Sequence, residues 1–222
     1  MSQSIIPIDL GGVNCYLLPA GEGFILVDTG IAAERADLEK VLEKAGCRPG
    51  NLRLILITHG DIDHVDNGAY LQAKYGAPVA MHALDAGMVE HGDMGWNRKP
   101  KPDQIKPLFG LMMLLMRWFG PRPSQFQTFK PDRLVEDGQD LAEYGCAAKV
   151  LHLPGHSQGS IGVLTDDGGL ICGDLFYNMP GFGFVDDLAQ HHASLDRLKS
   201  LPVRRVYPGH GRPCPVSQVI PG

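Results

Sequence analysis

The sequence has few cysteines, no excess of positive charge and no visible secretory signal, and each shortage excludes a class of protein. Its 222 residues carry a net charge of -5 with scattered Lys and Arg, so we expect no nucleic-acid partner. The five cysteines are odd in number and lack C-x-x-C spacing, which argues against a disulfide framework and a thiolate zinc site. No basic region followed by an apolar region opens the chain, so a cytoplasmic location is expected.

What the sequence does contain is an alternation of short apolar strands and helices. An apolar content of 44% is ordinary for a soluble protein, and we expect one domain over residues 1–222. The run 54–58 is too continuously apolar for an exposed strand, so it belongs in a sheet covered on both sides. Strands are expected at about 5–9, 14–18, 24–28, 54–58, 78–82, 147–152, 161–165, 170–172 and 204–207. Helices are expected at about 33–44, 67–75, 84–90 and 188–200. Two strand-rich halves, each ending in helices, predict two sheets packed face to face with helices outside.

The most informative motif is the run from His59 to His64, HGDIDH, which directly follows the apolar strand 54–58. Imidazoles and carboxylates bind catalytic divalent metals, and a strand end holds them rigidly at an open cleft. In an extended loop, alternate side chains project to the same side, so His59 and Asp61 can share one metal while Asp63 and His64 face another. Three later segments also consist of a strand-like run, a turn and a ligand type, and they end at His156, Asp174 and His210. The chain is therefore predicted to be a metalloenzyme.

These ordered segments resemble the metallo-β-lactamase superfamily, whose signature is H-x-H-x-D-H followed by a lone His, a lone Asp and a lone His. Residues 27–30 near the start and 208–211 near the end are also similar to family landmarks, so the match covers almost the whole chain. One position departs from the pattern, because Asp61 stands where the family usually has its second His. The resemblance implies an α/β fold, an αββα four-layer sandwich of two mixed sheets with flanking helices. It places the site at one edge, between the sheets.

The resemblance also implies two divalent metal ions that share a hydroxide, which acts as the nucleophile. The implied ligands are His59, Asp61 and His156 for the first ion, Asp63, His64 and His210 for the second, and Asp174 for both. A carboxylate at position 61 makes the centre more neutral than an imidazole would, which favours iron or manganese over zinc.

Asp63 and Tyr177 are the candidate catalytic residues. Tyr177 follows Asp174 by three residues, a spacing similar to that of family lactonases, in which a Tyr hydroxyl contacts the substrate carbonyl. Its phenol could donate a hydrogen bond to a developing oxyanion, or its ring could simply pack over the loop with Phe176. Asp28 either orients a metal ligand through a hydrogen bond or forms a plain turn.

The leading hypothesis for function is a metal-dependent hydrolase of an ester, thioester or lactone of a small metabolite. A thioesterase similar to glyoxalase II is the named alternative, although the chain lacks the C-terminal helical region with which that enzyme holds glutathione. A di-iron oxidoreductase related to the flavodiiron core is a second alternative, suggested by Asp61, and would need a separate electron donor. A non-catalytic binding module with a dead site is the third.

The Pro-rich segment 92–130 interrupts the alternation and contains the apolar run 108–119. About twenty apolar residues are needed to span a bilayer, so this shorter run predicts no transmembrane helix. The run is apolar on every face, so a neighbour must cover it. Three interpretations stay open: a core helix, a lid over the site or a homodimer contact, and attachment to a membrane surface. As a lid, its methionines would suit a substrate with an apolar acyl group.

Overall fold

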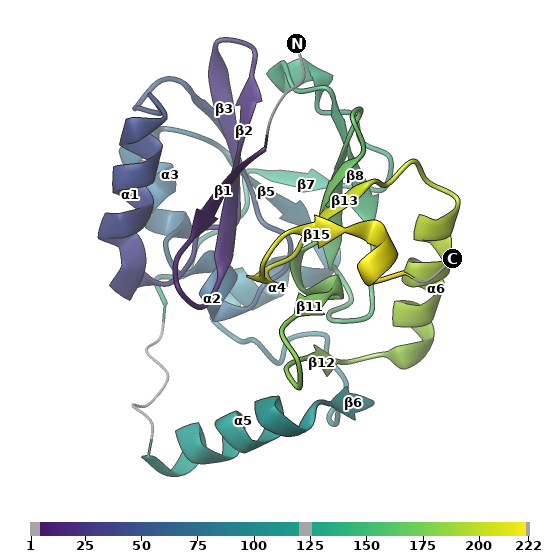
Figure 1. Ribbon diagram of the computed structural model, residues 1–222. Helices are drawn as coiled ribbons and strands as arrows, with labels where there is room; N and C mark the ends of the chain where they lie inside the picture. Colours follow the sequence, from purple (N-terminus) through teal and green to yellow (C-terminus); the bar gives the residue numbers. More distant parts are fainter. Residues whose placement is uncertain (1–4, 120–125, 221–222) are drawn as a thin grey trace.

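The computed structural model describes residues 5–119 and 126–220, and its main feature is a pair of β-sheets with helices on their outer sides (Figure 1). The first sheet has six strands in the order β1-β2-β3-β4-β5-β7, and the second has five in the order β15-β13-β10-β9-β8. Both sheets are mixed, because each combines antiparallel and parallel pairs. The predicted αββα sandwich is confirmed.

The first sheet begins as an antiparallel meander and continues as parallel strands. β1, β2 and β3 pair antiparallel, whereas β3, β4, β5 and β7 pair parallel. Parallel neighbours need crossover connections, and the helices between these strands supply them. The strands are β1 (Ile6–Asp9), β2 (Asn14–Ala20), β3 (Gly23–Val27), β4 (Leu52–Leu56), β5 (Val79–His82) and β7 (Arg133–Val135). The helices are α1 (Arg35–Lys44), α2 (Ile62–Val65), α3 (Gly68–Tyr75) and α4 (Ala83–His91).

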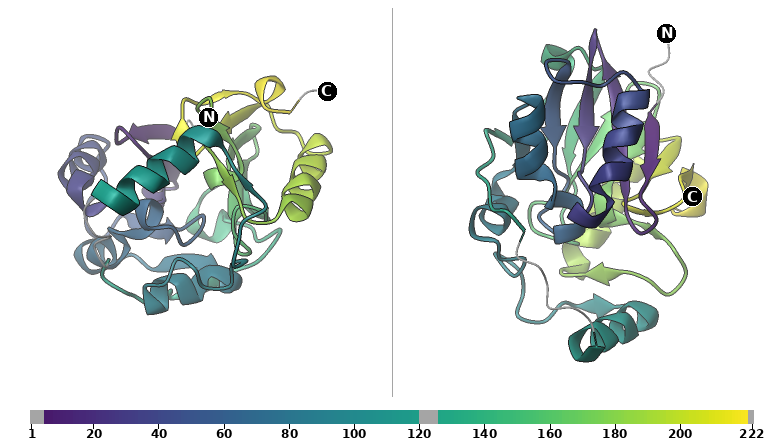
Figure 2. Two further views of the ribbon diagram at one scale, coloured as in Figure 1. Left: turned by 90° about the horizontal axis from the view of Figure 1, so that it is seen from below. Right: turned by 90° about the vertical axis from the view of Figure 1, so that its left-hand side faces the viewer.

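The second sheet is antiparallel except for its β10–β13 pair. Its strands are β8 (Ala148–His152), β9 (Ile161–Thr165), β10 (Gly169–Ile171), β13 (Arg205–Tyr207) and β15 (Cys214–Pro215). Helix α6 (Leu188–Lys199) covers its outer side (Figure 2). Two small ribbons complete the fold, β11 (Tyr177–Asn178) with β14 (His210–Gly211) and β6 (Gln104–Ile105) with β12 (Phe184–Val185). Observed bounds lie close to the expected ones for the strands and helices that were predicted, whereas α2, β6, β7, β11, β12, β14 and β15 were not predicted.

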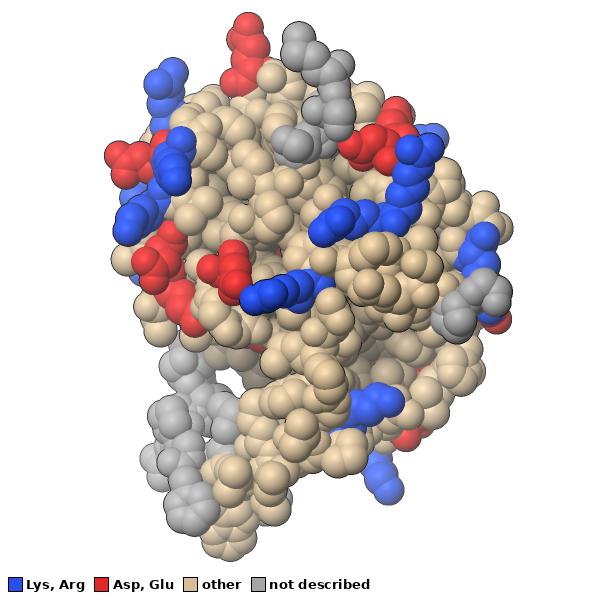
Figure 3. Space-filling view, in the orientation of Figure 1, with Lys and Arg blue, Asp and Glu red and all other residues tan. Residues whose placement is uncertain are grey.

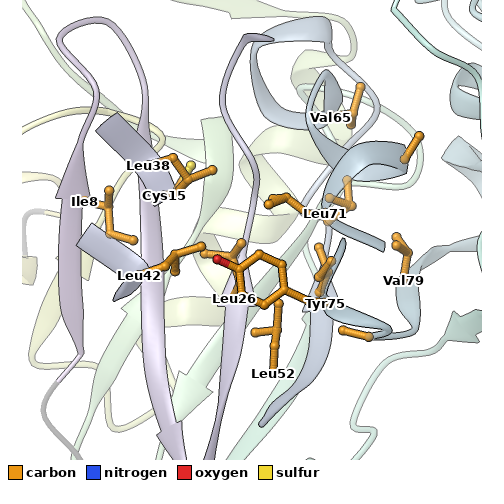
Figure 4. Close-up of a cluster of buried hydrophobic side chains, with 14 of the residues drawn as sticks. Ile8, Cys15, Leu26, Leu38, Leu42, Leu52, Val65, Leu71, Tyr75 and Val79 are labelled. Atoms are coloured by element: carbon orange, nitrogen blue, oxygen red, sulfur yellow. The ribbon is translucent and has the colours of Figure 1, made fainter. Parts of the chain in front are cut away.

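Three layers of buried apolar side chains hold the sandwich together. Figure 4 shows part of the outer layer of the first sheet, where Leu38 and Leu42 of α1 join one cluster with Leu26 and Tyr75. A second layer, which includes Tyr16, Ile25, Leu54, Val150 and Val163, fills the space between the sheets. A third layer joins the second sheet to α6. All five cysteines are buried, as expected for small apolar side chains.

Strand β4 confirms the predicted coverage on both sides, although it is shifted toward the N-terminus. Ile55 faces the layer under the helices, whereas Leu54 and Leu56 face the layer between the sheets. The strand ends at Leu56, so Ile57 and Thr58 belong to the loop that precedes the HGDIDH motif. The motif therefore starts in an irregular loop at the edge of the sandwich.

Helix α5 (Pro107–Phe119) lies apart from the two-sheet body (Figures 1 and 2). Its large apolar side chains Leu108, Leu111, Met113, Leu114, Leu115 and Trp118 are exposed. Figure 3 shows the described part of this helix with no charged side chain along most of its length. The core-helix interpretation is therefore wrong for the described side chains, while the lid, the homodimer contact and attachment to a membrane surface stay predictions. Residues 120–125 of the expected 92–130 insertion lie outside the described residues.

No helix within residues 5–119 and 126–220 combines the length and the apolar character that crossing a bilayer requires.

Candidate metal centre

Four loops from the two halves of the chain meet at one edge of the sandwich. The loop after β4 carries the HGDIDH motif, and the loops after β8, β10 and β13 carry His156, Asp174 and His210. In Figure 1, α2 and β11 lie at the same end of the two sheets. The backbone amide of Ile161 in β9 donates to the carbonyl of Thr58 at 2.9 Å, which ties the motif loop to the second sheet.

The structure brings all seven predicted ligands together in overlapping groups. Each group places its ligand atoms within 4.8 Å of one another, and the groups are His59, Asp61 and His156; His59, His64 and Asp174; and Asp63, His64 and His210. The first and third groups have the membership that the resemblance implies for two metal sites.

Asp174 lies between the two sites, where a bridging carboxylate is expected. Its Oδ1 is 3.4 Å from His64 Nε2, and its Oδ2 is 3.3 Å from His210 Nε2. The same Oδ2 is 4.0 Å from His59 Nε2 and 3.9 Å from His156 Nε2. This carboxylate therefore faces imidazoles of both groups.

The four imidazoles are oriented from outside the centre through their Nδ1 atoms. His64 Nδ1 is 2.8 Å from Asp28 Oδ2, and His59 Nδ1 is 3.0 Å from Thr58 Oγ1. His156 Nδ1 is 3.1 Å from the Phe184 carbonyl, and His210 Nδ1 is 2.6 Å from the Gly12 carbonyl. With Nδ1 as the donor to these oxygens, each ring turns Nε2 toward the centre, the arrangement typical of metal-binding histidines.

Asp28 orients the motif as one of the two sequence interpretations expects. Its Oδ1 accepts from the Thr58 amide and its Oδ2 accepts from the Thr58 hydroxyl, both at 2.8 Å. Oδ2 also contacts His64, so one buried carboxylate holds two residues of the ligand loop. The backbone of Asp28 has a positive φ of 60°, which is uncommon for a residue other than glycine. The residue with this backbone conformation is thus the one that contacts both Thr58 and His64.

Buried polar atoms that lack partners indicate that the cluster suits a metal. Within the described part of the chain, His59 Nε2, His64 Nε2 and Asp174 Oδ1 are buried without a hydrogen-bond partner. Such atoms cost about 1–3 kcal/mol each when unsatisfied. A Cβ at Gly209 would meet Asp174 Oδ1 and His64 Cε1, so glycine keeps the backbone close to the centre. Nitrogen and carboxylate donors in this arrangement fit first-row divalent cations.

Charges within the cluster are strongly coupled. Burial raises the pKa of the Asp174 carboxyl, but the imidazoles of His210 and His64 hold it well below its usual range. Burial lowers the pKa of His64, but Asp28, Asp174 and Asp63 raise it well above its usual value. The buried carboxylates and imidazoles thus stabilise each other's charged forms.

The motif differs from the expected extended loop after Asp61. Residues 62–65 form the single helical turn α2, for which Asp61 is the N-cap residue with an extended backbone. In this helical turn the side chains of Asp63 and His64 both reach the second group. The predicted assignment of ligands to two groups is therefore observed, but the extended loop that was expected to produce it is not. Asp63 is 35% exposed, which leaves this side of the centre open to solvent.

Tyr177 lies at the centre, with its hydroxyl directed at the bridging carboxylate. The hydroxyl donates to Asp174 Oδ2 at 2.6 Å, and the ring stacks on His210 with 5.3 Å between ring centroids. Burial and the Asp174 charge raise the pKa of this phenol well above its usual value, so it stays protonated. A catalytic role for Tyr177 stays a prediction.

Sequence reasoning missed Arg98, which belongs to the 92–130 segment. Its Nη2 donates to Asp61 Oδ1 at 2.7 Å, and its side chain is only 9% exposed. Burial raises the pKa of Asp61, but Arg98, His156 and His59 hold it well below its usual range. No motif surrounds Arg98 in the sequence, so only the fold reveals this contact.

Asp85 is a second missed residue, and it connects two ligand loops. Its Oδ2 accepts from the Ser157 hydroxyl at 2.6 Å and from the Gly60 amide at 3.3 Å. Its Oδ1 accepts from the Gly159 amide at 2.7 Å. Asp85 thereby fixes the loop of His156 against the loop of His59. Its position inside helix α4 carries no sequence signal for this role.

The remaining histidines belong to none of the three groups. They are His82, His91, His152, His191 and His192. His82 and His152 stack on each other with 4.2 Å between ring centroids.

Comparison with known proteins gives concordant results. The sequence model of the Metallo-beta-lactamase superfamily matches residues 8–210. An uncharacterized protein of Mycobacterium leprae is 30% identical over 74% of this chain and 68% of its own length. Hydroxyacylglutathione hydrolase GloC of Haemophilus influenzae is 28% identical over 95% of this chain and 91% of its own length. For the relative from Mycobacterium bovis, the match spans 61% of that protein's length.

Solved structures share the architecture. TTHA1623, solved in a di-iron-bound form, is 30% identical with a TM-score of 0.63, over 98% of this chain and 96% of that chain. The Rm3 metallo-beta-lactamase has a TM-score of 0.70 at 22% identity, over 94% of this chain and 76% of that chain. At 22% identity, the similarity to Rm3 concerns the fold alone.

Proposed function

Because this chain belongs to the metallo-β-lactamase superfamily, we propose that it is a dinuclear metal-dependent hydrolase of an acyl thioester or ester. The observation that carries the proposal is the pair of three-residue groups joined by Asp174. The name of the GloC relative, a hydroxyacylglutathione hydrolase, supports a thioester among the ester, thioester and lactone classes.

His59, Asp61 and His156 would hold one cation, Asp63, His64 and His210 would hold the other, and Asp174 would contact both. When bound, such a pair of ions lowers the pKa of water and polarises a carbonyl oxygen. The outer contacts of the imidazoles keep their Nε2 atoms directed inward, so the site is organised before any ion or substrate arrives.

Tyr177 and Asp63 are the residues that we propose to act on the substrate side. The Tyr177 phenol is protonated and adjoins the centre, and once a cation holds Asp174 its single proton would be free to turn from Asp174 Oδ2 to an oxyanion. Asp63 lies on the open side, where its carboxylate can orient the attacking water and accept its proton.

An apolar acyl group is the part of the substrate that the surroundings favour. The ring of Phe184 packs edge-on against His156 with 5.1 Å between centroids. Phe109 of α5 stacks on Phe184 at 6.3 Å and contacts Phe182 edge-on at 6.5 Å. This row of rings extends from the metal centre to α5. It supports an acyl chain that lies along the rings, with α5 as the lid.

Iron is the metal that we propose first, followed by manganese and zinc. The support is TTHA1623, which is 30% identical and was solved in a di-iron-bound form. The charge of Asp61 does not by itself favour iron or manganese, because the guanidinium of Arg98 pairs with that carboxylate. Elemental analysis after metal-limited expression checks the identity; zinc alone with full zinc-supported activity would contradict iron.

The proposal is tested with protein loaded separately with Fe²⁺, Mn²⁺ or Zn²⁺ and a series of acyl thioesters, esters and lactones. We expect release of acid, together with thiol from the thioesters or alcohol from the esters, that requires metal, increases with acyl chain length and disappears in His59→Ala and His210→Ala. A protein that binds two ions yet hydrolyses no substrate of these classes would refute the hydrolase.

A di-iron oxidoreductase is the second candidate, favoured by the same di-iron neighbour. It predicts consumption of oxygen or nitric oxide that depends on an added reductant. A redox-inert protein with hydrolase activity would reject it.

A further inference from the structure

We propose that Arg98 and Asp61 act as one unit that takes the place of an imidazole at the first metal position. In this unit Arg98 is a positioning residue that makes Asp61 a ligand through one oxygen and cancels its charge. The inference rests on the proposed metal centre. It concerns a residue from a segment outside the ligand motifs.

The two oxygens of Asp61 have different partners. Oδ1 accepts from Arg98 Nη2 at 2.7 Å. Oδ2 is 2.8 Å from His156 Nε2 and 3.5 Å from His59 Nε2, so it is the oxygen that faces the first group. An unrestrained carboxylate can rotate or use both oxygens, whereas an imidazole offers a single donor atom. The contact with Arg98 leaves Asp61 one donor atom for the centre as well.

Arg98 is itself held firmly. Its guanidinium carbon lies 5.0 Å from the centroid of the Phe184 ring, the same ring that packs on His156. The amide of the next residue, Lys99, lies 3.2 Å from Oδ1 of the buried Asp186. The ring and the backbone contact therefore fix the cation beside Asp61, where little water can screen the pair.

The charges of Arg98 and Asp61 cancel, so the pair as a whole is neutral, as an imidazole is. An aspartate in place of histidine adds a negative charge next to a metal site, and the buried guanidinium adds a positive one. Arg98 Nε is buried without a hydrogen-bond partner among the described residues, and Asp61 is the only acidic side chain there that forms an ion pair with Arg98. Removing one member of such a pair leaves the other uncompensated, whereas removing both is often tolerated.

Arg98→Met should have opposite effects on metal affinity depending on whether residue 61 is Asp or His. In the natural protein, Arg98→Met frees Asp61 to rotate and should weaken binding at the first site. In an Asp61→His background, Arg98 faces a metal with no carboxylate between them, so Arg98→Met should strengthen binding. A role confined to packing would lower affinity in both backgrounds.

The experiment titrates the full chain with Co²⁺ alone and follows its visible absorption, with stoichiometry from elemental analysis. We expect Arg98→Met to weaken one of two Co²⁺ sites by tenfold or more, as loss of a ligand's hydrogen-bond partner commonly does. Arg98→Lys should restore part of the affinity, because it retains the charge. Lys101→Met, which removes an exposed charge from the same segment, is the matched control and should change neither site.

Asp61→His with Arg98→Met should bind the first Co²⁺ more tightly than Asp61→His alone, and circular dichroism should show all variants folded. Equal losses in both backgrounds, or no loss from Arg98→Met, would overturn the proposal. Natural protein that binds no Co²⁺ would instead refute the proposed metal centre, and the inference with it.

Discussion

At the scale of single residues, the four imidazoles of the centre are held by three kinds of acceptor. A carboxylate holds His64, a hydroxyl holds His59, and backbone carbonyls hold His156 and His210. Carbonyl acceptors leave no trace in the sequence, because any residue can supply them. This explains why only Asp28 was foreseen as an orienting residue.

Tyr177→Phe removes the hydroxyl that donates to Asp174 Oδ2. We expect turnover to fall roughly tenfold or more, since losing a donor to the transition state costs a few kcal/mol. Steady-state kinetics of the metal-loaded protein measure the change. Tyr70→Phe, which removes a hydroxyl bonded to Glu39 far from the centre, is the control. An unchanged rate for Tyr177→Phe would remove this phenol from the mechanism.

The raised pKa of His210 should make metal binding depend on pH. Burial lowers its pKa, but Asp174 and Asp63 raise it from 6.5 to about 10 in the metal-free protein. The imidazole is therefore protonated at neutral pH and must lose that proton to bind a cation. We expect metal affinity to increase as pH rises toward 10, with protons released on binding.

Calorimetric titration with Zn²⁺ in buffers of different ionisation enthalpy counts these protons. The same raised pKa means that the ion pairs of His210 stabilise the metal-free protein below about pH 6.5 and that this stabilisation is lost as pH rises toward 10. Binding heats that do not depend on the buffer would contradict the protonated state.

At the scale of secondary structure, periodicity and turn residues predicted nine of the strands and the ligand loops, but not the short strands β6, β7, β11, β12, β14 and β15. Continuous apolar runs such as Leu54–Leu56 place themselves in a covered sheet, and their ends bring the ligands to one edge. The helical turn α2 was missed because four residues carry no periodic pattern. The contacts of Arg98 and Asp85 were beyond prediction, since they depend on how helix α4 and the 92–130 segment fold over the motif.

The position of helix α5 predicts how activity depends on the length of the substrate's acyl chain. Phe109→Ala shortens the row of rings between α5 and His156. The kcat/KM for a long-chain acyl thioester should therefore fall about tenfold relative to that for its acetyl analogue. The ratio of kcat/KM values for the two substrates measures this preference. Leu115→Ser, an exposed position further along the helix, should leave the ratio unchanged. Equal losses for both substrates would argue against α5 as an acyl-binding lid.

At the scale of the whole molecule, the centre joins the two halves of the sandwich. The HGDIDH motif comes from the first sheet, while His156, Asp174 and His210 come from the second. Metal should therefore stabilise the folded chain, because only the folded chain presents all the ligands.

Chelation should lower the Tm by on the order of 10 °C when free metal had been present at about a thousandfold excess over Kd, equivalent to about 4 kcal/mol. Differential scanning calorimetry with and without chelator measures the shift. His59→Ala combined with His210→Ala should unfold at the same temperature in both conditions. A chelator-independent Tm in the natural protein would contradict a structural contribution from metal.

The contacts of the first strands with the last ligand loop affect the order of events during synthesis. The side-chain amide of Asn14 donates to the carbonyls of Pro208 and Gly211, and the Tyr16 hydroxyl donates to Pro208. A nascent chain therefore exposes its HGDIDH motif long before the partners of Asn14 leave the ribosome. During that interval the early motif is an incomplete chelator, open to whichever cation is most abundant. We therefore expect the fidelity of metal loading to depend on how quickly the end of the chain folds onto its beginning.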